Sequence, residues 1–376
     1  MTTDRFGKIL VIAGSGIGNI LLATPLVRSL RRAYPTAGID VLVPPGRGGI
    51  LEGNPDVNRV VEVVRKQGMR ASSRFFRHMW RHYDLALSAQ AGDRSIINAW
   101  SAGRRRSSQV RSRTRPGAWQ RLLLDRWVVA DDETHAVIHG LRLLDGTDVP
   151  RCYDLVPPVC SDAERRALEE VLPFARDDDA YAVLHFYPRN PYKAWTPEGW
   201  RVVIDHIDAL GLRVVVTGGG GQEELDHVRS VLTDDIKEKV VDLAGGIGLM
   251  QVSDLLRGAA LFVGPDTGVT HLASAHGIPT VALFGPTEPI YWGPWPAGYA
   301  ADQSPFLRRG SQRVNNVCVV QRSAACIGCG KEGCDDNPRH LTRCMQELPE
   351  EDVTRAIDEM MKDAAGFTSE IGGNSG

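Results

Sequence analysis

A polar turn between an apolar run and a helical pattern carries the residue types that bind a diphosphate. The turn, Asp266-Thr267-Gly268, directly follows the apolar stretch that ends near Val263. Backbone N–H groups at a helix N-terminus and the helix dipole attract anions, and a glycine lets a pyrophosphate approach the backbone closely. His271 falls one turn later on the same side of the predicted helix. The alternative interpretation is a well-capped helix with a buried histidine.

Two cations lie at an equivalent place earlier in the chain. Arg189 and Lys193 stand between the strand-like run that ends at His185 and a helix that opens at Pro197. Loops that follow parallel strands meet at one edge of a sheet, so these cations are predicted near the same ligand site. A lysine ammonium suits phosphate as a compact charge. The alternative is a surface loop with two solvated cations.

A glycine-rich turn, residues 14–19, follows the first apolar run. Its spacing is G-x-G-x-G, whereas the dinucleotide fingerprint is G-x-G-x-x-G. The second apolar run ends at Val43-Pro44-Pro45, with no acidic residue that would bind a ribose. Both differences argue against a nicotinamide cofactor. They leave a tight turn, with or without another ligand.

Four cysteines near the C-terminus have a spacing typical of a metal centre. Cys326, Cys329, Cys334 and Cys344 follow one another closely, with Cys318 upstream. Four reduced thiolates at such spacing predict a tetrahedral structural site for zinc or iron. The alternatives are small buried thiols or an adventitious disulfide.

Short apolar runs alternate with helical patterns, as in parallel sheets wrapped by helices. Strands are predicted over 8–13, 39–43, 57–64, 85–87, 181–185, 213–217, 240–243, 261–263 and 280–284. Helices are predicted over 161–172, 197–210, 251–257, 269–276 and 350–362, with a frayed tail from residue 364. The proline-rich stretch 149–158 interrupts the rhythm. The predicted fold class is α/β, with two Rossmann-like domains that face each other across a cleft.

The predicted domains are an N-terminal acceptor domain, a C-terminal donor domain and a C-terminal helix with a flexible tail. Their bounds are 1–155, 156–350 (with the cysteine-rich segment 318–344) and 351–376. The net charge of −2 hides an asymmetry, because residues 1–150 hold 23 basic and 13 acidic side chains. The segment 103–126 contains eight arginines. Trp119 lies within this segment and Trp127 directly after it, and both could contact lipid or sugar. This charge indicates an anionic partner: phosphorylated glycolipid, membrane surface or nucleic acid. No aromatic-rich nucleic-acid module accompanies it, and a merely solvated surface is the alternative.

Residues 263–289 resemble the signature of glycosyltransferase family nine, the heptosyltransferases of lipopolysaccharide assembly. In that family D-[ST]-G-x-x-H is followed by a G-P-T-x-P loop, and this chain has Asp266–His271 and Gly285–Pro289. The similarity extends to residues 8–25 and 83–95, to Lys193-x-Trp195 and to the cysteine-rich end. It implies the GT-B fold, a nucleotide-diphosphate sugar donor, inversion at the anomeric carbon and no catalytic metal. Some relatives bind iron through similar cysteine clusters.

The resemblance also implies roles for single residues. Lys193 would hold the donor phosphates. The 266–268 turn would bind the pyrophosphate through backbone amides, with His271 beside it. Glu223 or Glu224, after the glycines 218–221, would bind the nucleoside ribose, and which of the two does so stays open.

The first glycine-rich turn departs from the family pattern. Many members carry an aspartate after its last glycine as the general base, whereas this chain has Asn19. An amide cannot accept a proton from a hydroxyl group at neutral pH. Asp93, after another strand of the N-terminal domain, is the substitute candidate. The alternative for Asp93 is an N-cap of the following helix.

The expected activity is inverting transfer of a sugar, heptose foremost, from ADP-heptose or another nucleotide sugar. The expected acceptor is a hydroxyl group of an anionic glycolipid or other glycan. No apolar stretch reaches about 18 residues and no secretory signal is present, so a cytoplasmic protein with peripheral contact at the inner membrane face is expected. The alternatives are a non-catalytic sugar-nucleotide-binding scaffold and a nucleotide-sugar epimerase.

Overall fold

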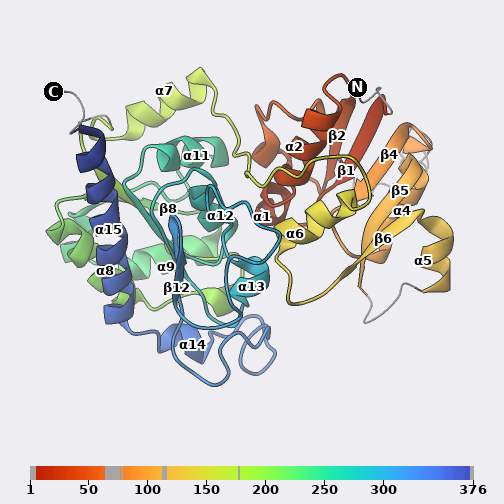
Figure 1. Ribbon diagram of the computed structural model, residues 1–376. Coiled ribbons are helices and arrows are strands. Elements are labelled where there is room, and N and C mark those ends of the chain that lie inside the picture. Colours follow the sequence, from red (N-terminus) through yellow and green to blue (C-terminus); the bar gives the residue numbers. More distant parts are fainter. Residues whose placement is uncertain (1–5, 64–76, 78, 112–116, 177, 373–376) are drawn as a thin grey trace. The chain divides into compact units, whose positions relative to one another are not determined.

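The computed structural model describes residues 6–63, 77, 79–111, 117–176 and 178–372, with the backbone alone for residues 363–372. The chain divides into two compact units (Figure 1). Unit 1 comprises Met1–Pro158 and Gly298–Ser304, and unit 2 comprises Val159–Ala297 and Pro305–Gly376. Each unit has a largely parallel sheet with helices on its faces, which confirms the α/β fold class.

The described residues of unit 1 form a six-stranded sheet in the order β3-β2-β1-β4-β5-β6, and every neighbouring pair is parallel. Its strands are β1 (Lys8–Ile12), β2 (Gly38–Val43), β3 (Arg59–Glu62), β4 (Tyr83–Ser88), β5 (Gly103–Arg111) and β6 (Arg126–Ala130). Its helices are α1 (Ile17–Leu21), α2 (Thr24–Ala33), α4 (Asp93–Ala102), α5 (Ala118–Leu123) and α6 (Ala136–Leu141), with 3-10 turns η1 (Gly48–Leu51) and η2 (Arg142–Leu144). Four of these strands lie where the apolar runs predicted them.

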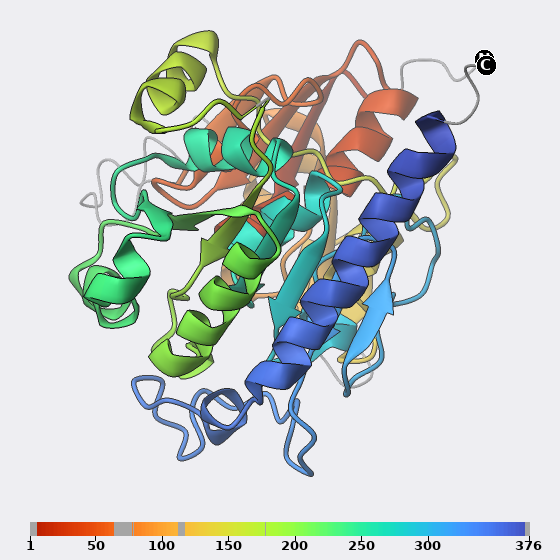
Figure 2. The ribbon, with the colours of Figure 1, turned by 90° about the vertical axis from the view of Figure 1, so that its left-hand side faces the viewer.

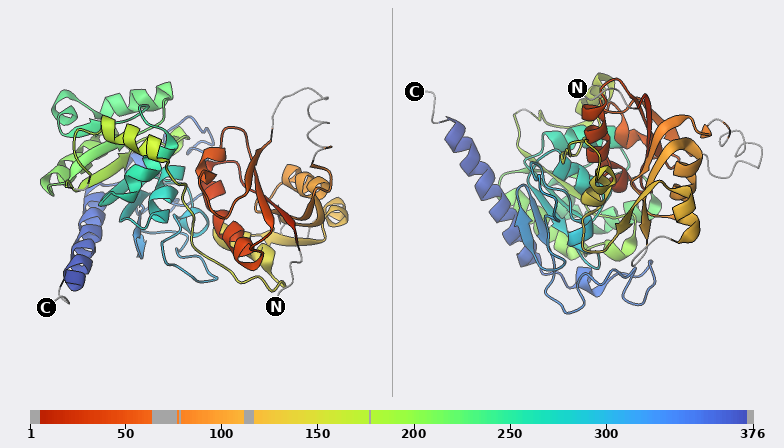
Figure 3. Two further views of the ribbon diagram at one scale, coloured as in Figure 1. Left: turned by 90° about the horizontal axis from the view of Figure 1, so that it is seen from above. Right: turned by 45° about the vertical axis from the view of Figure 1, so that its right-hand side comes forward.

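Strand β5 was not predicted, because its sequence GRRRSSQVR has no apolar pattern. In the structure β5 pairs with β4 on one side and β6 on the other, and Ser107, Ser108 and Gln109 are buried. Backbone pairing with a strand on each side therefore overrides the weak strand propensity of these residues. Helices α4 and α5, which flank β5 in sequence, lie side by side on one face of this sheet (Figure 3, left panel).

A short segment far along the chain completes unit 1. Asp302 accepts hydrogen bonds from Arg151 and from the hydroxyl group of Tyr153, the latter at 2.6 Å. Ser304 Oγ accepts a hydrogen bond from the backbone N–H of His135 at 2.8 Å. These contacts bind Gly298–Ser304 to the proline-rich stretch 149–158 and to the start of α6. Because this segment belongs to unit 1, the chain passes between the units at three points.

The described residues of unit 2 form a seven-stranded sheet in the order β12-β13-β11-β10-β7-β8-β9, in which only β12 runs antiparallel to its neighbour. Its strands are β7 (Tyr181–His185), β8 (Arg213–Thr217), β9 (Val240–Asp242), β10 (Leu261–Pro265), β11 (Thr280–Leu283), β12 (Gln312–Val314) and β13 (Val317–Val320). Its helices are α7 (Asp162–Val171), α8 (Pro197–Ala209), α9 (Gln222–Val231), α10 (Asp234–Lys237), α11 (Leu249–Arg257), α12 (Gly268–Ala275), α13 (Pro289–Trp292), α14 (Arg343–Gln346) and α15 (Glu350–Gly372), with a 3-10 turn η3 (Pro191–Lys193).

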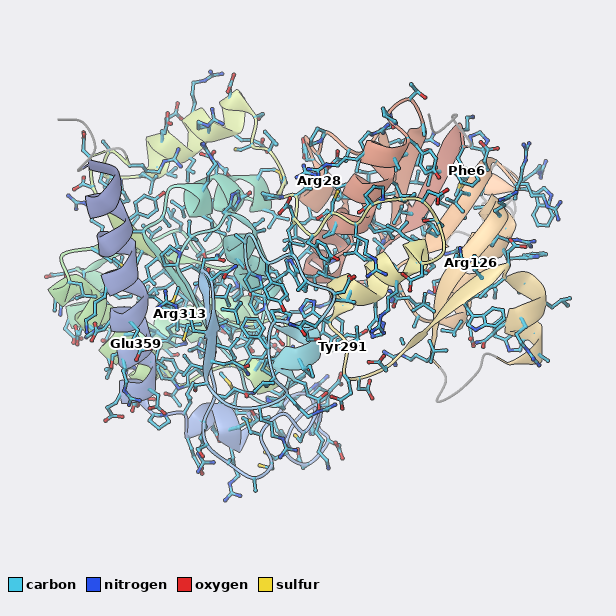
Figure 4. The ribbon with its side chains drawn as sticks, in the orientation of Figure 1. Phe6, Arg28, Arg126, Tyr291, Arg313 and Glu359 are labelled. Carbon is cyan, nitrogen blue, oxygen red and sulfur yellow. The ribbon has the colours of Figure 1, made fainter. Side chains whose placement is uncertain are left out.

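Helices α8, α9 and α15 bury their apolar sides against one face of this sheet. Figure 2 shows α15 lying across that face beside α8. Arg313 of β12 donates a hydrogen bond to the backbone carbonyl of Glu359 in α15, and both residues are labelled in Figure 4. The predicted tail from residue 364 is helical as far as Gly372, because the alanines at its start favour continuation of the helix. None of the helices that the structure describes has the length and apolar character needed to span a bilayer.

Candidate functional site

Four loops follow neighbouring parallel strands at the carboxyl edge of the unit 2 sheet. In the spatial order β11-β10-β7-β8 they begin at Phe284, Asp266, Phe186 and Gly218. Because these strands all run in one direction, their loops meet at the same edge, where ligands of open α/β sheets bind. Three of the four loops contain residues that the sequence predicted for the donor site.

A buried tryptophan determines where Lys193 lies. Lys193 closes the turn η3, and two residues later the indole N–H of Trp195 donates to the backbone carbonyl of Leu348 at 3.2 Å. The ring packs over Gly199, where a Cβ atom would lie 2.4 Å from it. Only glycine permits so close an approach, so the indole and the start of α8 hold the loop that carries Lys193.

Lys193 forms an ion pair with Asp266 across two loops. Its Nζ atom lies 2.5 Å from Asp266 Oδ2, and the two side chains are 17% and 8% exposed. Burial acts to raise the pKa of Asp266, but the charge of Lys193, the proximity of His271 and a hydrogen bond from Thr287 outweigh it, so this pKa is lowered. Burial acts to lower the pKa of Lys193, but Asp266 outweighs it and the pKa is raised. Both groups are therefore charged at neutral pH. The sequence had singled out the loop of Thr287 but not this residue.

The start of α12 has the geometry of an anion site. Thr267 is the N-cap, and its Oγ1 accepts a hydrogen bond from the backbone N–H of Thr270 at 3.4 Å. The hydroxyl group of Thr270 in turn donates to the carbonyl of Pro265 at 2.5 Å. The backbone N–H groups of Gly268 and Val269 have no acceptor among the described residues. Two free donors and the positive end of the helix dipole therefore lie beside an ammonium group, which suits a diphosphate.

His271 lies one turn into α12 and is buried. Its Nδ1 atom has no hydrogen-bond partner among the described residues. Burial lowers the pKa of His271 to about 4, although the charge of Asp266 acts in the opposite direction. The imidazole is neutral at pH 7, and its unpaired nitrogen leaves a polar atom that a ligand can satisfy.

The two glutamates after the glycine loop differ in the structure. Glu223 is exposed, whereas Glu224 is half-buried and folds back onto the loop. A Cβ atom on Gly219 would lie 2.7 Å from Glu224 Oε2, so this carboxylate lies directly against the loop backbone. Burial raises the pKa of Glu224, while a hydrogen bond from the Gly219 backbone acts to lower it. Of the two glutamates, Glu224 is thus the one that lies against the glycine loop after β8.

Two aromatic side chains near these glutamates were missed by the sequence interpretation. The rings of Tyr187 and His227 pack against each other at a tilt of 42°, with centroids 5.0 Å apart. Burial raises the pKa of Tyr187, and the charges of Glu223 and Glu224 raise it further. The only available sequence signal was an aromatic residue two positions after β7. Arg189, two residues later, is exposed and forms no ion pair with any described residue, so its ligand role stays a prediction.

In unit 1, Asn19 and Asp93 follow the neighbouring strands β1 and β4 at one edge of the sheet. Asn19 packs onto Gly14, where a Cβ atom would lie 2.6 Å from that of Asn19. Asp93 is the first residue of α4, whose N-cap is Gly92 without a side-chain capping bond. The alternative that Asp93 is an N-cap is therefore wrong. Its exposed carboxylate lies 3.4 Å from Nε2 of Gln120 in α5.

Several arginines of the segment 103–126 are occupied within unit 1. Arg104 pairs with Asp84 at 3.4 Å, and Arg106 pairs with Asp125 at 3.2 Å. Arg126, labelled in Figure 4, donates to a backbone carbonyl. Arg104 and Arg106 stand at the start of β5, and thus at the edge of the sheet away from the loops that follow β1 and β4. These two arginines are therefore poorly placed to bind an acceptor at those loops.

Other arginines of the same segment, with Arg111 and Arg121 among them, are not occupied in this way. Arg111 and Arg121 are exposed and form no ion pair with a residue that the structure describes. Arg113 and Arg115 lie outside the described residues. Arg111 ends β5, so it lies at the same edge of the sheet as Asn19.

The predicted metal centre finds no support in the structure. Within the described ranges, no group of three or more His, Cys, Asp or Glu side chains is placed to hold a metal ion. Cys326, Cys329 and Cys334 are exposed free thiols, whereas Cys344 is buried. The Sγ atom of Cys344 lies 3.2 Å from the position of a Cβ atom on Gly285, so it packs into unit 2. These cysteines are close together in the sequence. In the fold, packing buries the thiol of Cys344 and leaves the other three thiols on the surface.

Comparison with known proteins places these features in context. The model of glycosyltransferase family 9 (heptosyltransferase) matches residues 72–306. Lipopolysaccharide heptosyltransferase 3 of Escherichia coli is 29% identical over 291 residues, which cover 74% of this chain and 83% of that protein.

Two solved structures are similar along nearly the whole chain. The structure of E. coli ADP-heptose lps heptosyltransferase II has a TM-score of 0.71 at 20% identity, and E. coli heptosyltransferase WaaC with ADP has 0.66 at 20% identity. Each likeness covers 95% of this chain and 99% of the other. These likenesses show a fold of the GT-B type.

Proposed function

The chain belongs to glycosyltransferase family 9, and we propose that it transfers heptose from ADP-heptose to a hydroxyl group of an anionic lipopolysaccharide-type glycolipid. The ion pair of Lys193 and Asp266 beside the open start of α12 carries this proposal. The names of the relatives support the sugar and the acceptor class, and the ADP bound to a protein of similar fold supports the nucleotide.

In this proposal unit 2 binds the donor. The diphosphate lies against the N–H groups of Gly268 and Val269, with Lys193 and the neutral His271 beside it. The ribose lies near Glu224. Asp266 fixes the position of the Lys193 ammonium, so this charge is in place before the donor arrives.

The reaction follows from these contacts. The acceptor oxygen attacks the anomeric carbon, the bond from that carbon to the diphosphate oxygen breaks, and ADP leaves with the electron pair. Attack from the face opposite the leaving group inverts the anomeric centre. Lys193 and the start of α12 stabilise the negative charge that grows on the diphosphate. Preorganised electrostatic stabilisation of this kind is worth several kcal/mol.

The proton of the acceptor hydroxyl group needs a base, and Asp93 is the proposed one. It follows β4 at the same edge of the sheet as Asn19, and its carboxylate is exposed. The amide of Asn19 can orient the hydroxyl group by hydrogen bonding but cannot take its proton. We further propose that the protein acts in the cytoplasm, on an acceptor held at the inner membrane face.

Turnover and donor binding together test the proposal. Lys193→Ala is expected to lower turnover by about a hundredfold or more, because it removes the charge that faces the leaving diphosphate. Thermal stabilisation by ADP-, UDP- and GDP-sugars measures donor choice, because only a ligand that binds the folded state raises the melting temperature. Near-normal turnover of Lys193→Ala, with circular dichroism unchanged, would contradict the site.

Asn19 favours a second function, that of a sugar-nucleotide binder without catalysis. It predicts that ADP-heptose raises the melting temperature while no product forms with any glycolipid acceptor. Mass spectrometry of the acceptor after incubation with ADP-heptose distinguishes the two, because transfer adds one heptose to its mass.

A further inference from the structure

Residues 80–127 of unit 1 include large apolar side chains that are exposed to solvent. Leu122 is 82% exposed, and Trp80, Trp119 and Trp127 are between 40% and 44% exposed, as is Ile97 at 43%. Together these five residues define the Trp–Leu surface. They are the only large apolar side chains of unit 1 that are exposed among its described residues, and all of them lie between residues 80 and 127. Large apolar residues that are exposed in a group are typical of an interaction site.

Helices α4 and α5 carry the centre of this surface. Trp119 and Leu122 are one turn apart on α5, a helix in which no residue is buried. Ile97 lies on α4, the neighbouring helix on the same face of the sheet (Figure 3, left panel). Trp80 stacks edge-on against Trp100 of α4 with ring centroids 5.2 Å apart. Both helices therefore direct apolar side chains outward from the sheet they cover.

The segment of the sequence that carries this surface is strongly basic. Residues 77–130 contain eleven arginines and three aspartates, together with four of the eight tryptophans of the chain. Arg94 and Arg121, on the same two helices, are exposed and form no ion pair with any described residue. Tryptophan beside unpaired arginine is the composition that prefers the boundary between lipid headgroups and hydrocarbon.

The side-chain types, together with the proposed acceptor, favour a lipid surface. Arginine and tryptophan would serve for nucleic acid, but the most exposed apolar side chain is the aliphatic Leu122, which cannot stack on bases. Tryptophan and arginine are also enriched in protein interfaces, so side-chain types alone do not exclude a protein partner. The membrane lipid acceptor of the proposed function decides for a bilayer, because the enzyme must reach that lipid there. A bilayer offers hydrocarbon to Leu122 and anionic headgroups to the arginines, so it matches both the apolar and the basic side chains.

We propose that the Trp–Leu surface, with Arg94 and Arg121, docks unit 1 on a bilayer rich in anionic phospholipid. This inference deepens the proposed function, because an enzyme that glycosylates a membrane lipid must reach its acceptor at the bilayer. A contact links the surface to the proposed acceptor site: Gln120 of α5 lies 3.4 Å from the carboxylate of Asp93. When α5 contacts the bilayer, the glycan of a lipid anchored there is then close to Asp93, the proposed base.

Flotation of the full chain with lipid vesicles tests the docking without donor or acceptor. The protein is expected to float with vesicles of equal phosphatidylglycerol and phosphatidylcholine, to bind phosphatidylcholine alone far less, and to lose binding as salt rises. Leu122→Ser should weaken partitioning about tenfold through lost burial of its side chain. Arg121→Gln should weaken it about fivefold, the factor that corresponds to about 1 kcal/mol for each basic residue near an anionic surface.

Matched variants in unit 2 control for exposure and charge. Leu307 is 73% exposed and Arg166 is exposed without an ion pair to a described residue. Leu307→Ser and Arg166→Gln should partition like the wild type. Leu122→Ser should also keep its melting temperature and its turnover of a water-soluble, deacylated acceptor, since the change removes no buried contact.

Four results would overturn the docking surface. Two concern vesicles: the protein binds neutral and anionic vesicles equally, or Leu122→Ser and Arg121→Gln partition like the wild type. The other two point to a different partner: the protein binds an oligonucleotide tightly and these variants abolish that binding, or the protein is a dimer that Leu122→Ser converts to a monomer. Failure here leaves the proposed function intact if ADP-heptose still stabilises the protein. Vesicle binding without any heptose transfer would instead contradict the proposed function alone.

Discussion

Replacement of Lys193 by methionine isolates the charge of the pair, because methionine keeps most of the length of the side chain and removes the ammonium group. Asp266 is then a buried carboxylate without its partner, where the wild type has an ion pair at 2.5 Å. Loss of one partner of a buried ion pair costs about 3–5 kcal/mol in the free energy of unfolding. We expect a loss of this size at pH 7.

The pH dependence of this loss has a definite sign. In the wild type the pKa of Asp266 is lowered, so its contribution to stability is present above the pKa of an unfolded carboxyl group and is lost as pH falls through the folded-state value. In Lys193→Met the largest cause that lowers the pKa of Asp266 is removed, so burial should dominate and this pKa should rise above that of the unfolded chain. The folded variant then takes up a proton that the unfolded chain does not. The deficit of the variant relative to the wild type should therefore shrink as pH falls from 7 toward 4.

Urea unfolding followed by tryptophan fluorescence at several pH values measures this deficit. The double variant Lys193→Met/Asp266→Asn should recover most of the lost stability at pH 7, because no buried charge is left unpaired. Lys239→Met is the matched control. It removes an ammonium group that also lies 2.5 Å from a carboxylate, that of Asp205, but on the surface, with side chains 38% and 54% exposed. It should leave the free energy of unfolding nearly unchanged, because solvent screens an ion pair between exposed side chains.

Either of two results would refute this reasoning. A deficit of Lys193→Met that stays constant from pH 7 to pH 4 would mean that Asp266 is not the group left uncompensated. A double variant as unstable as Lys193→Met would mean that the two side chains are not coupled in the folded protein.

Three further predictions, with five variants, concern the rest of the site. Asp93→Asn should lower turnover more than tenfold with donor affinity unchanged, whereas Asn19→Asp should keep or raise activity; the opposite pattern in steady-state kinetics would move the base elsewhere. Glu224→Gln should weaken ADP binding about tenfold by calorimetry, as expected for a lost hydrogen bond to a charged group, while Glu223→Gln should not; equal effects would contradict the ribose assignment. Burial lowers the pKa of His271 to about 4, so the unfolded chain takes up a proton on this histidine before the folded chain does. The free energy of unfolding should therefore fall as pH drops from about 6.5 to 4. If His271→Gln shows the same dependence of this free energy on pH, the histidine is not the cause.

The sequence identified the features of this protein that depend on neighbouring residues. The strand, turn and helix around Asp266-Thr267-Gly268 lie where the pattern predicted them, because a helix start is determined locally by its cap and by apolar periodicity. The two α/β series were visible for the same reason. Strand β5 was not, because its polar residues become a strand only when β4 and β6 pair with it.

The tertiary structure decided which of the predicted residues come together. Lys193 and Asp266 are 73 positions apart and meet because β7 and β10 are neighbours in the sheet, an order that no local pattern encodes. Glu223 and Glu224 are indistinguishable by type and place in the sequence, and only the close approach to Gly219 separates them. The inward packing of Cys344 is likewise set by the loop at Gly285. Sequence spacing determines which groups can be near one another, whereas strand order and side-chain packing determine which atoms make contact.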